Sequence, residues 1–179
     1  MTARHALTAA AAAAALLTLS ACGSSDDGKP SGQDPAQQDT KEVTTTAQAY
    51  MTAWLSRPSQ PEKMCDLETK AARPNYSKDG GSLKGCVTTY SSYFADQKPD
   101  NSALTVSVNH VQDVAASGTR PAGKGALATG KRAGGEPFRY ALRLVKEAGA
   151  WRIAQSEEAD GNKYAHTADP VADLLANGS

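Results

Sequence analysis

The stretch PFRYALRLVKEAGAWRIAQ, residues 137–155, decides the fold of this 179-residue chain. Large residues alternate with small or charged ones on both sides of a short turn at residues 147–149. One face of this stretch would carry Phe138, Tyr140, Leu142, Leu144, Trp151, Ile153 and Gln155. A period of two around a glycine-containing turn predicts an antiparallel β-hairpin with an apolar inner face and a charged outer face.

Two more strands are predicted before this hairpin. From about residue 103 the inward positions of the first would be Leu104, Val106, Val108 and His110. The second covers residues 125–131, between Gly123 and Gly134. Together with the hairpin they predict an antiparallel meander of about four strands.

Three helices are predicted earlier in the chain. The first has Val43, Ala47, Tyr50, Met51, Trp54 and Leu55 on one face. Asp39 and Glu42 have the spacing of a capping box at its start. The second begins near Ser59, and its apolar face contains either Leu67 or Glu68. The third follows Ser82 and has Leu83, Cys86, Val87, Tyr90, Tyr93 and Phe94 on one face.

Helices followed by strands predict one α+β domain over residues 41–158, with three N-terminal helices packed on the sheet. About 118 residues are enough for one hydrophobic core and too few for two. Residues 159–179 are mostly polar and are expected to form a C-terminal tail.

The chain begins with a segment that resembles the signal of bacterial lipoproteins. LSAC at residues 19–22 has the form of a lipobox, and the apolar run before it is too short to remain as a membrane-spanning helix. The resemblance implies a signal peptide over 1–21, lipid on the Cys22 thiol, and a disordered tether over 22–40. It places the protein on the extracytoplasmic face of the cell membrane. A secretory signal that ends in a cysteine by chance is the alternative.

Cys65 and Cys86 remain after Cys22 is assigned to lipid. In an oxidising compartment, their simplest state is a disulfide, worth roughly 3 kcal/mol in the chain-entropy model. Two free buried thiols are the alternative. No pair of histidines and cysteines has the spacing of a zinc site, so neither a metal nor another cofactor is expected.

The charges of the mature chain nearly cancel. Removal of Arg4 with the signal peptide leaves 18 basic residues against 19 acidic ones. Neutrality and export both argue against a nucleic-acid partner. Arg139, Arg143 and Arg152 are expected on the outer face of the hairpin. They would form either a solvated sheet face or a surface for an anionic partner, such as lipid headgroups, wall polymers or an acidic protein.

The order of elements, with Tyr50 and Trp54 on the first helix and a closing strand GAWRI at 149–153, resembles the nuclear-transport-factor-2-like superfamily. The resemblance covers roughly residues 41–158 and extends to many exported actinobacterial lipoproteins. It implies a curved sheet that wraps the helices into a cone with an open mouth. The superfamily includes enzymes such as ketosteroid isomerase and many non-catalytic binding domains, so the fold alone does not choose between them.

Trp54, Tyr90, His110 and Tyr140 are expected to face one interior space, either an open cavity or a filled core. With an open cavity, the leading hypothesis is a non-catalytic domain that binds a small apolar ligand or an envelope partner, with no catalytic residue assigned. The alternative is an isomerase- or dehydratase-like enzyme with His110 as base, helped by Asp113 and Tyr140. Signatures of serine hydrolases and phosphate-binding loops do not occur in the sequence.

Overall fold

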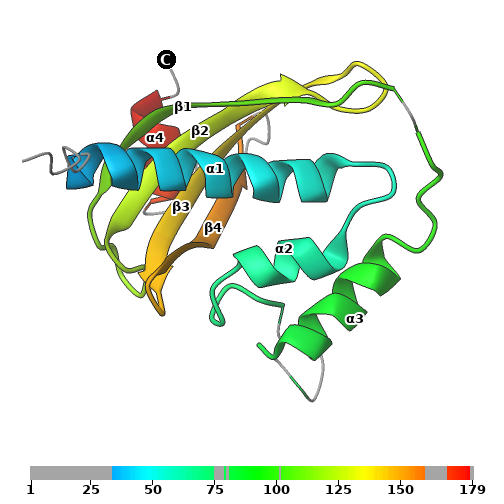
Figure 1. Cartoon of the computed structure of the whole chain (residues 1–179), viewed down its shortest axis with the longest axis horizontal. Coiled ribbons are helices and arrows are strands. Elements are labelled where there is room, and N and C mark those ends of the chain that lie inside the picture. Colours follow the sequence, from blue (N-terminus) through cyan, green and yellow to red (C-terminus); the bar gives the residue numbers. More distant parts are fainter. Residues whose placement is uncertain (1–33, 75–78, 80, 101, 160–168, 178–179) are drawn as a thin grey trace, which may run out of the picture. The chain divides into compact units, whose positions relative to one another are not determined.

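The computed structural model describes residues 34–74, 79, 81–100, 102–159 and 169–177 (Figure 1). Its helices are α1 (Pro35–Leu55), α2 (Pro61–Leu67), α3 (Leu83–Tyr93) and α4 (Val171–Asn177). Its strands are β1 (Thr105–Val114), β2 (Gly123–Lys131), β3 (Pro137–Glu147) and β4 (Ala150–Glu158). The expected signal peptide, Cys22 and most of the expected tether lie outside the described residues.

The four strands form one sheet in the order β1-β2-β3-β4, and each strand is antiparallel to its neighbours. This confirms the predicted meander and the α+β class. The β3–β4 hairpin closes at Ala148 and Gly149, which both have positive φ (50° and 83°). Two such residues form the tight turn whose twist matches that of the flanking strands.

Helix α1 lies across one face of the sheet (Figure 1). Its buried side chains pack in one core cluster with the inner face of β2, β3 and β4. The contributors from α1 are Val43, Ala47, Tyr50, Met51, Ala53 and Leu55, and those from the sheet include Ala126, Ala128, Leu142, Leu144 and Ile153. Each large apolar side chain in such a core contributes about 1.5–3 kcal/mol to stability.

The start of α1 corrects two expectations. The helix begins at Pro35, so part of the expected disordered tether is helical, and Asp39 lies inside the helix rather than at its cap. Proline suits the first helical position because its missing N–H needs no partner there. The Asp39 carboxylate accepts hydrogen bonds from Lys146 Nζ (2.7 Å) and Trp151 Nε1 (3.3 Å). The Lys146 hydrogen bond lowers the pKa of Asp39.

The other helices do not form the expected set of three on one sheet face. Helix α3 packs mainly on α2, and only Tyr90 and Phe94 of its apolar face pack against the core as partly buried side chains. The end of α2 meets the free edge of β4, where Glu68 forms a one-residue parallel bridge with Ile153. The Thr69 N–H donates to the Ile153 carbonyl (2.8 Å).

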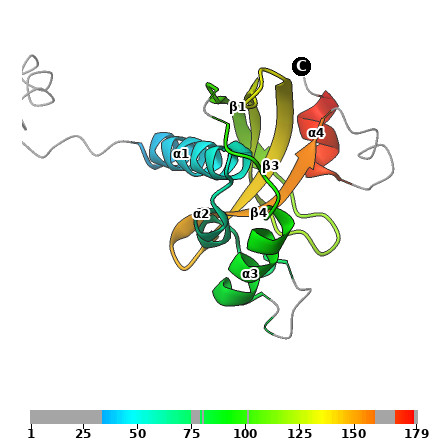
Figure 2. The ribbon, with the colours of Figure 1, turned by 90° about the vertical axis from the view of Figure 1, so that its right-hand side faces the viewer.

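A fourth helical segment, α4, covers the opposite face of the sheet (Figure 2). The expected polar tail is therefore wrong for residues 169–177, while 160–168 lie outside the described residues. Val171, Leu174 and Leu175 are buried against an outer cluster that includes Val114, Leu127 and Ala141. The backbone of Ala172–Ala176 has positive φ, so this turn is left-handed. Gly125 permits the close packing, because a Cβ there would lie 2.6 Å from Leu175 Cδ2.

Candidate ligand-binding site

A pocket of about 500 Å³ opens beside α1 and α3. It is lined by Trp54, Ala72, Pro74, Thr89, Tyr90, Tyr93 and Phe94, and we call it the aromatic pocket. Four of these seven residues carry aromatic rings, and none is a lysine or an arginine. Tyr93 is 79% exposed, so the pocket reaches the surface. Its volume and composition are those of a site for a small, mostly apolar molecule.

The rings of the aromatic pocket support one another. Tyr90 stacks on Phe94 with centroids 5.9 Å apart, and Tyr93 meets Phe94 edge-on at 4.9 Å. Trp54 lies 5.7 Å from Tyr50 in an edge-to-face contact. Tyr50 and Trp54 share one side of α1, and Tyr90 and Phe94 are likewise four residues apart at the end of α3, so each pair lies one turn apart. Aromatic rings that meet in offset or edge-on contacts stabilise each other.

Two of the four residues predicted to share an interior space, Trp54 and Tyr90, line the aromatic pocket. Tyr140 lies one layer deeper and does not line it. Its ring is 5.2 Å from that of Trp54, and only 5% of the residue is exposed. Burial raises the pKa of Tyr140, while Arg132, which donates a hydrogen bond to its hydroxyl (3.2 Å), acts in the opposite direction.

His110 is not where the period of β1 predicted it. It is exposed and has φ = 52°, at a register shift between Asn109 and Gln112. The extra residue of this bulge turns His110 out of the inward row, and Val111 packs against the core instead. Asp113 is also exposed and pairs with Lys124 (2.6 Å). The set of His110, Asp113 and Tyr140 is therefore not brought together.

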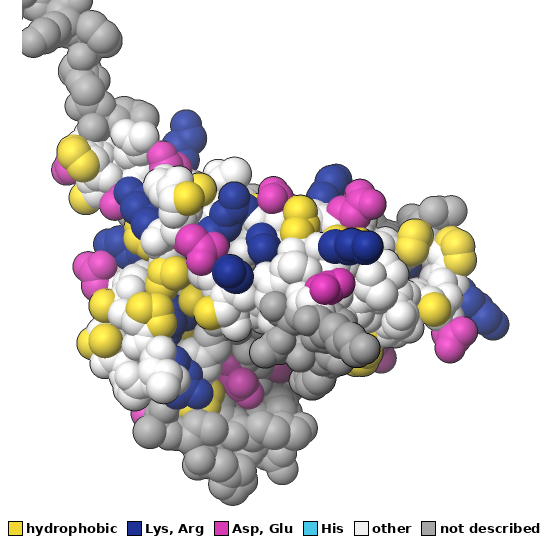
Figure 3. All heavy atoms as spheres, turned by 90° about the horizontal axis from the view of Figure 1, so that it is seen from below, with side chains coloured by type: hydrophobic (Ala, Val, Ile, Leu, Met, Phe, Trp, Pro, Cys, Tyr) yellow, Lys and Arg dark blue, Asp and Glu magenta, His cyan; other side chains and the backbone are white. Residues whose placement is uncertain are grey.

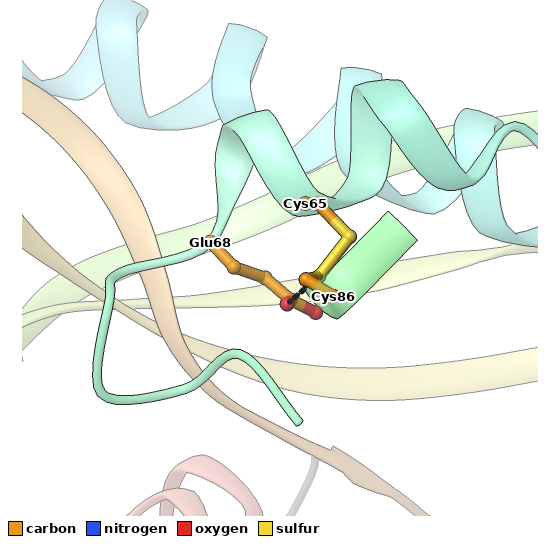
Figure 4. Close-up of side chains that lie close together, drawn as sticks. All are labelled: Cys65, Glu68 and Cys86. Atoms are coloured by element: carbon orange, nitrogen blue, oxygen red, sulfur yellow. Dashed lines mark hydrogen bonds between the residues drawn. A yellow bond between two sulfur atoms is a disulfide. The ribbon is translucent and has the colours of Figure 1, made fainter. Parts of the chain in front are cut away.

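Glu68 is the buried polar residue beside the pocket that sequence reasoning missed. It is 2% exposed, and its Oε1 accepts hydrogen bonds from the Tyr50 hydroxyl (3.0 Å) and the Tyr90 hydroxyl (2.8 Å). Its Oε2 lies 3.6 Å from Cys86 Sγ (Figure 4). Burial raises the pKa of Glu68, and the tyrosine hydrogen bonds and Arg73 oppose this. The sequence analysis placed either Leu67 or Glu68 on the apolar face of the predicted second helix, whereas Glu68 directly follows the last residue of α2.

Cys65 and Cys86 form a disulfide, as predicted, with Cα atoms 5.9 Å apart. The bridge joins α2 to α3, and both cysteines are fully buried. Figure 4 shows the Glu68 carboxylate pointing at this bridge. The sulfur and carboxylate atoms lie within 4.8 Å of one another, a spacing that suits a metal ion. Because the two sulfurs are bonded to each other, they offer no thiolate to a metal.

The three arginines do not form a shared exposed surface. Arg143 is fully buried, forms an ion pair with Asp169, and donates to the carbonyls of Ala115 (2.9 Å) and Pro121 (2.6 Å). Arg152 lies 3.6 Å from Asp66, and Arg139 is half-buried. Figure 3 shows basic and acidic side chains interspersed over one face. The expected surface for an anionic partner is therefore wrong at Arg143, because this side chain is fully buried.

Comparison of the chain with protein-family models, curated proteins and solved structures finds no significant match. Among the described helices, none has both the length and the apolar character needed to cross a membrane. The fold is an α+β arrangement with an open four-stranded antiparallel sheet.

Proposed function

We propose that this protein is a lipid-anchored extracytoplasmic lipoprotein whose domain binds a small apolar ligand without transforming it. The observation that carries the binding function is the aromatic pocket, lined by Trp54, Tyr90, Tyr93 and Phe94. The lipobox at residues 19–22 supports the anchor, and the Cys65–Cys86 disulfide suits an oxidising compartment. A helix laid on an antiparallel meander is compatible with a nuclear-transport-factor-2-like cone.

Binding is favoured over catalysis by the groups that surround the pocket. The described part of its lining offers tyrosine and threonine hydroxyls but no carboxylate, imidazole or amine. A general base must reach the proton it removes. Glu68 is buried and holds two tyrosine hydroxyls, and exposed His110 does not line the pocket. The alternative of an enzyme with His110 as base gains no support from this geometry.

An envelope protein remains the second candidate partner. In the part of the chain that the structure describes, the exposed large hydrophobic side chains Leu83 (46%) and Tyr93 (79%) both belong to α3. A protein that docked there would depend on Leu83, whereas a ligand in the aromatic pocket would not, since Leu83 is outside its lining.

Fluorescence of Trp54 tests the proposed function. The chain has two tryptophans, so Trp151→Phe leaves Trp54 as the only one. In that background, titration with a soluble neutral probe such as 2-naphthol should shift or quench the Trp54 emission in a saturable way. Phe94→Ala should weaken binding about tenfold, because an aromatic contact and its buried area are lost. Leu83→Ala is the matched control and should leave the affinity unchanged. A lack of saturable change would contradict the proposal.

A further inference from the structure

We infer that the aromatic pocket selects organic cations, namely small molecules that carry a quaternary or alkylated ammonium group on an apolar body. This inference rests on the proposed function and names the class of ligand. It is carried by two features together: four aromatic rings in the lining, and the Glu68 carboxylate held behind one of them.

The lining suits a cation whose shell of alkyl groups is poorly hydrated. Trp54, Tyr90, Tyr93 and Phe94 line the pocket. The face of an aromatic ring carries negative electrostatic potential and attracts ammonium groups within about 6 Å of the ring centroid. Among the described residues, no lysine or arginine lines the pocket to repel such a group. Alkylated ammonium groups lose little hydration on entering an apolar site, so ring faces can replace water around them.

Glu68 adds a negative charge behind this lining. The Tyr90 hydroxyl donates to Glu68 Oε1 (2.8 Å), and the ring of Tyr90 lines the pocket. A phenol that donates its proton to a carboxylate becomes more electron-rich, because hydrogen bonds polarise the groups they join. Tyr50 donates to the same oxygen from α1 (3.0 Å) and fixes the carboxylate in place. The carboxylate therefore acts on the pocket through Tyr90 without entering it.

The basic side chain of Arg73 does not cancel this arrangement. Arg73 lies between the lining residues Ala72 and Pro74 in sequence, but its Nε donates to the Cys65 carbonyl (2.9 Å) at α2. Its positive charge favours the ionised form of Glu68. An anionic ligand would meet neutral rings backed by a carboxylate, which is unfavourable. A neutral ligand gains the apolar contacts alone.

Choline and its neutral isostere 3,3-dimethylbutan-1-ol test the inference, because they share a shape and differ by one charge. Binding of each to the full-length Trp151→Phe protein would be followed by Trp54 fluorescence and by calorimetry. We expect choline to bind at least about tenfold more tightly than the alcohol, because the aromatic rings and the Glu68 carboxylate both favour the positive charge. If the alcohol binds as tightly as choline, selectivity is refuted while the proposed function stands. If neither choline nor the alcohol binds, both the proposed function and the inferred selectivity are refuted.

Glu68→Gln separates the charge of the carboxylate from its shape. Glutamine keeps an acceptor oxygen for Tyr50 and Tyr90, so the pocket should persist. Choline affinity should fall about tenfold, and the affinity for the alcohol should change less than about twofold. Glu62→Gln, on the exposed side of α2, removes the same charge from the chain and should change neither affinity. Equal losses of choline affinity in both variants would refute the role of Glu68.

Discussion

Among the described residues, two charged side chains are buried, and they are stabilised in different ways. Glu68 is held by two tyrosine hydroxyls, which are neutral donors. Arg143 is paired with the Asp169 carboxylate and donates to two backbone carbonyls. The charge of Arg143 is therefore balanced locally, while that of Glu68 is stabilised mainly by hydrogen bonds. The two residues should respond differently to mutation.

Loss of the Asp169 charge should be strongly destabilising. Asp169→Asn leaves the fully buried Arg143 guanidinium without its counter-ion. Breaking a buried pair in this way costs about 3–5 kcal/mol, which urea unfolding would measure. Asp66→Asn is the matched control, because Asp66 is 67% exposed in its contact with Arg152. Its cost should stay below about 1 kcal/mol. Similar costs for the two variants would contradict the burial of Arg143.

Glu68 should make the native protein lose stability as the pH rises. The pKa of Glu68 is raised above its ordinary value of 4.5 by burial, so the unfolded chain ionises before the folded one. Glu68 therefore contributes fully to the free energy of unfolding at pH values below its pKa in the unfolded chain. This contribution is lost as the pH rises through the pKa of Glu68 in the folded protein. Glu68→Gln does not titrate, so its stability relative to the native protein should increase from about pH 4 to pH 7. Urea unfolding at several pH values would measure this difference, with Glu62→Gln as the exposed control.

At the scale of elements, the disulfide holds α3 in place. Helix α3 has eleven residues and packs mainly on α2, so it depends on the bridge more than on the sheet. The double variant Cys65→Ser/Cys86→Ser should lose about 2–5 kcal/mol of stability. Amide exchange should speed up in α3 before it does in β3. Peptide mapping without reductant should recover the two cysteines in one linked peptide, and complete alkylation of both would exclude the bridge.

The sequence predicted the meander because alternation along a strand has a simple steric cause. Side chains of β3 alternate between the two covered faces, and the positions expected to face inward, Phe138, Tyr140, Leu142 and Leu144, are buried in the α1 core. Bulges are not encoded by that period. One turns His110 outward, and another, between Arg143 and Leu144, places Gln155 opposite Arg143 instead of on the inner face. Each bulge inserts one residue, and the residues beyond it then face the opposite side of the sheet.

The outer face and the buried carboxylate could not be predicted for a different reason. Charged residues at alternate strand positions normally face water. They are buried only when a segment that is distant in the sequence packs over them. Val171, Leu174 and Leu175 formed a visible apolar cluster, but its place on the sheet depends on the path of the whole chain. The pocket residues Trp54 and Tyr90 were predicted because a helical stripe fixes a common side. The sequence left open whether Leu67 or Glu68 faces inward, so the carboxylate that accepts the hydrogen bond from Tyr90 was not predicted.

At the scale of the whole molecule, the proposed anchor and the domain are separable. Intact mass of the native protein should show a chain that begins at Cys22 and carries a diacylglyceryl group. Cys22→Ala should abolish this added mass, because the thiol that would carry the lipid is gone, and should leave an unlipidated form, uncleaved or released, that lacks the normal membrane retention. Retention of the variant in the detergent phase would refute the lipoprotein assignment. Secretion of native protein without lipid would indicate an ordinary signal peptide.

The open sheet has consequences for self-association, because a four-stranded meander exposes two lateral strands to other chains. On the β4 side, the backbone of Glu68 and Thr69 occupies the hydrogen-bonding groups at Ile153. On the β1 side, Gln48 of α1 donates to the Val106 carbonyl (3.3 Å), and the bulge at His110 breaks the straight ladder. Interruptions of this kind discourage strand addition between molecules and the growth of amyloid. A protein concentrated on a membrane by its anchor would meet its own copies often. The interrupted edges of the sheet would then reduce aggregation between these copies.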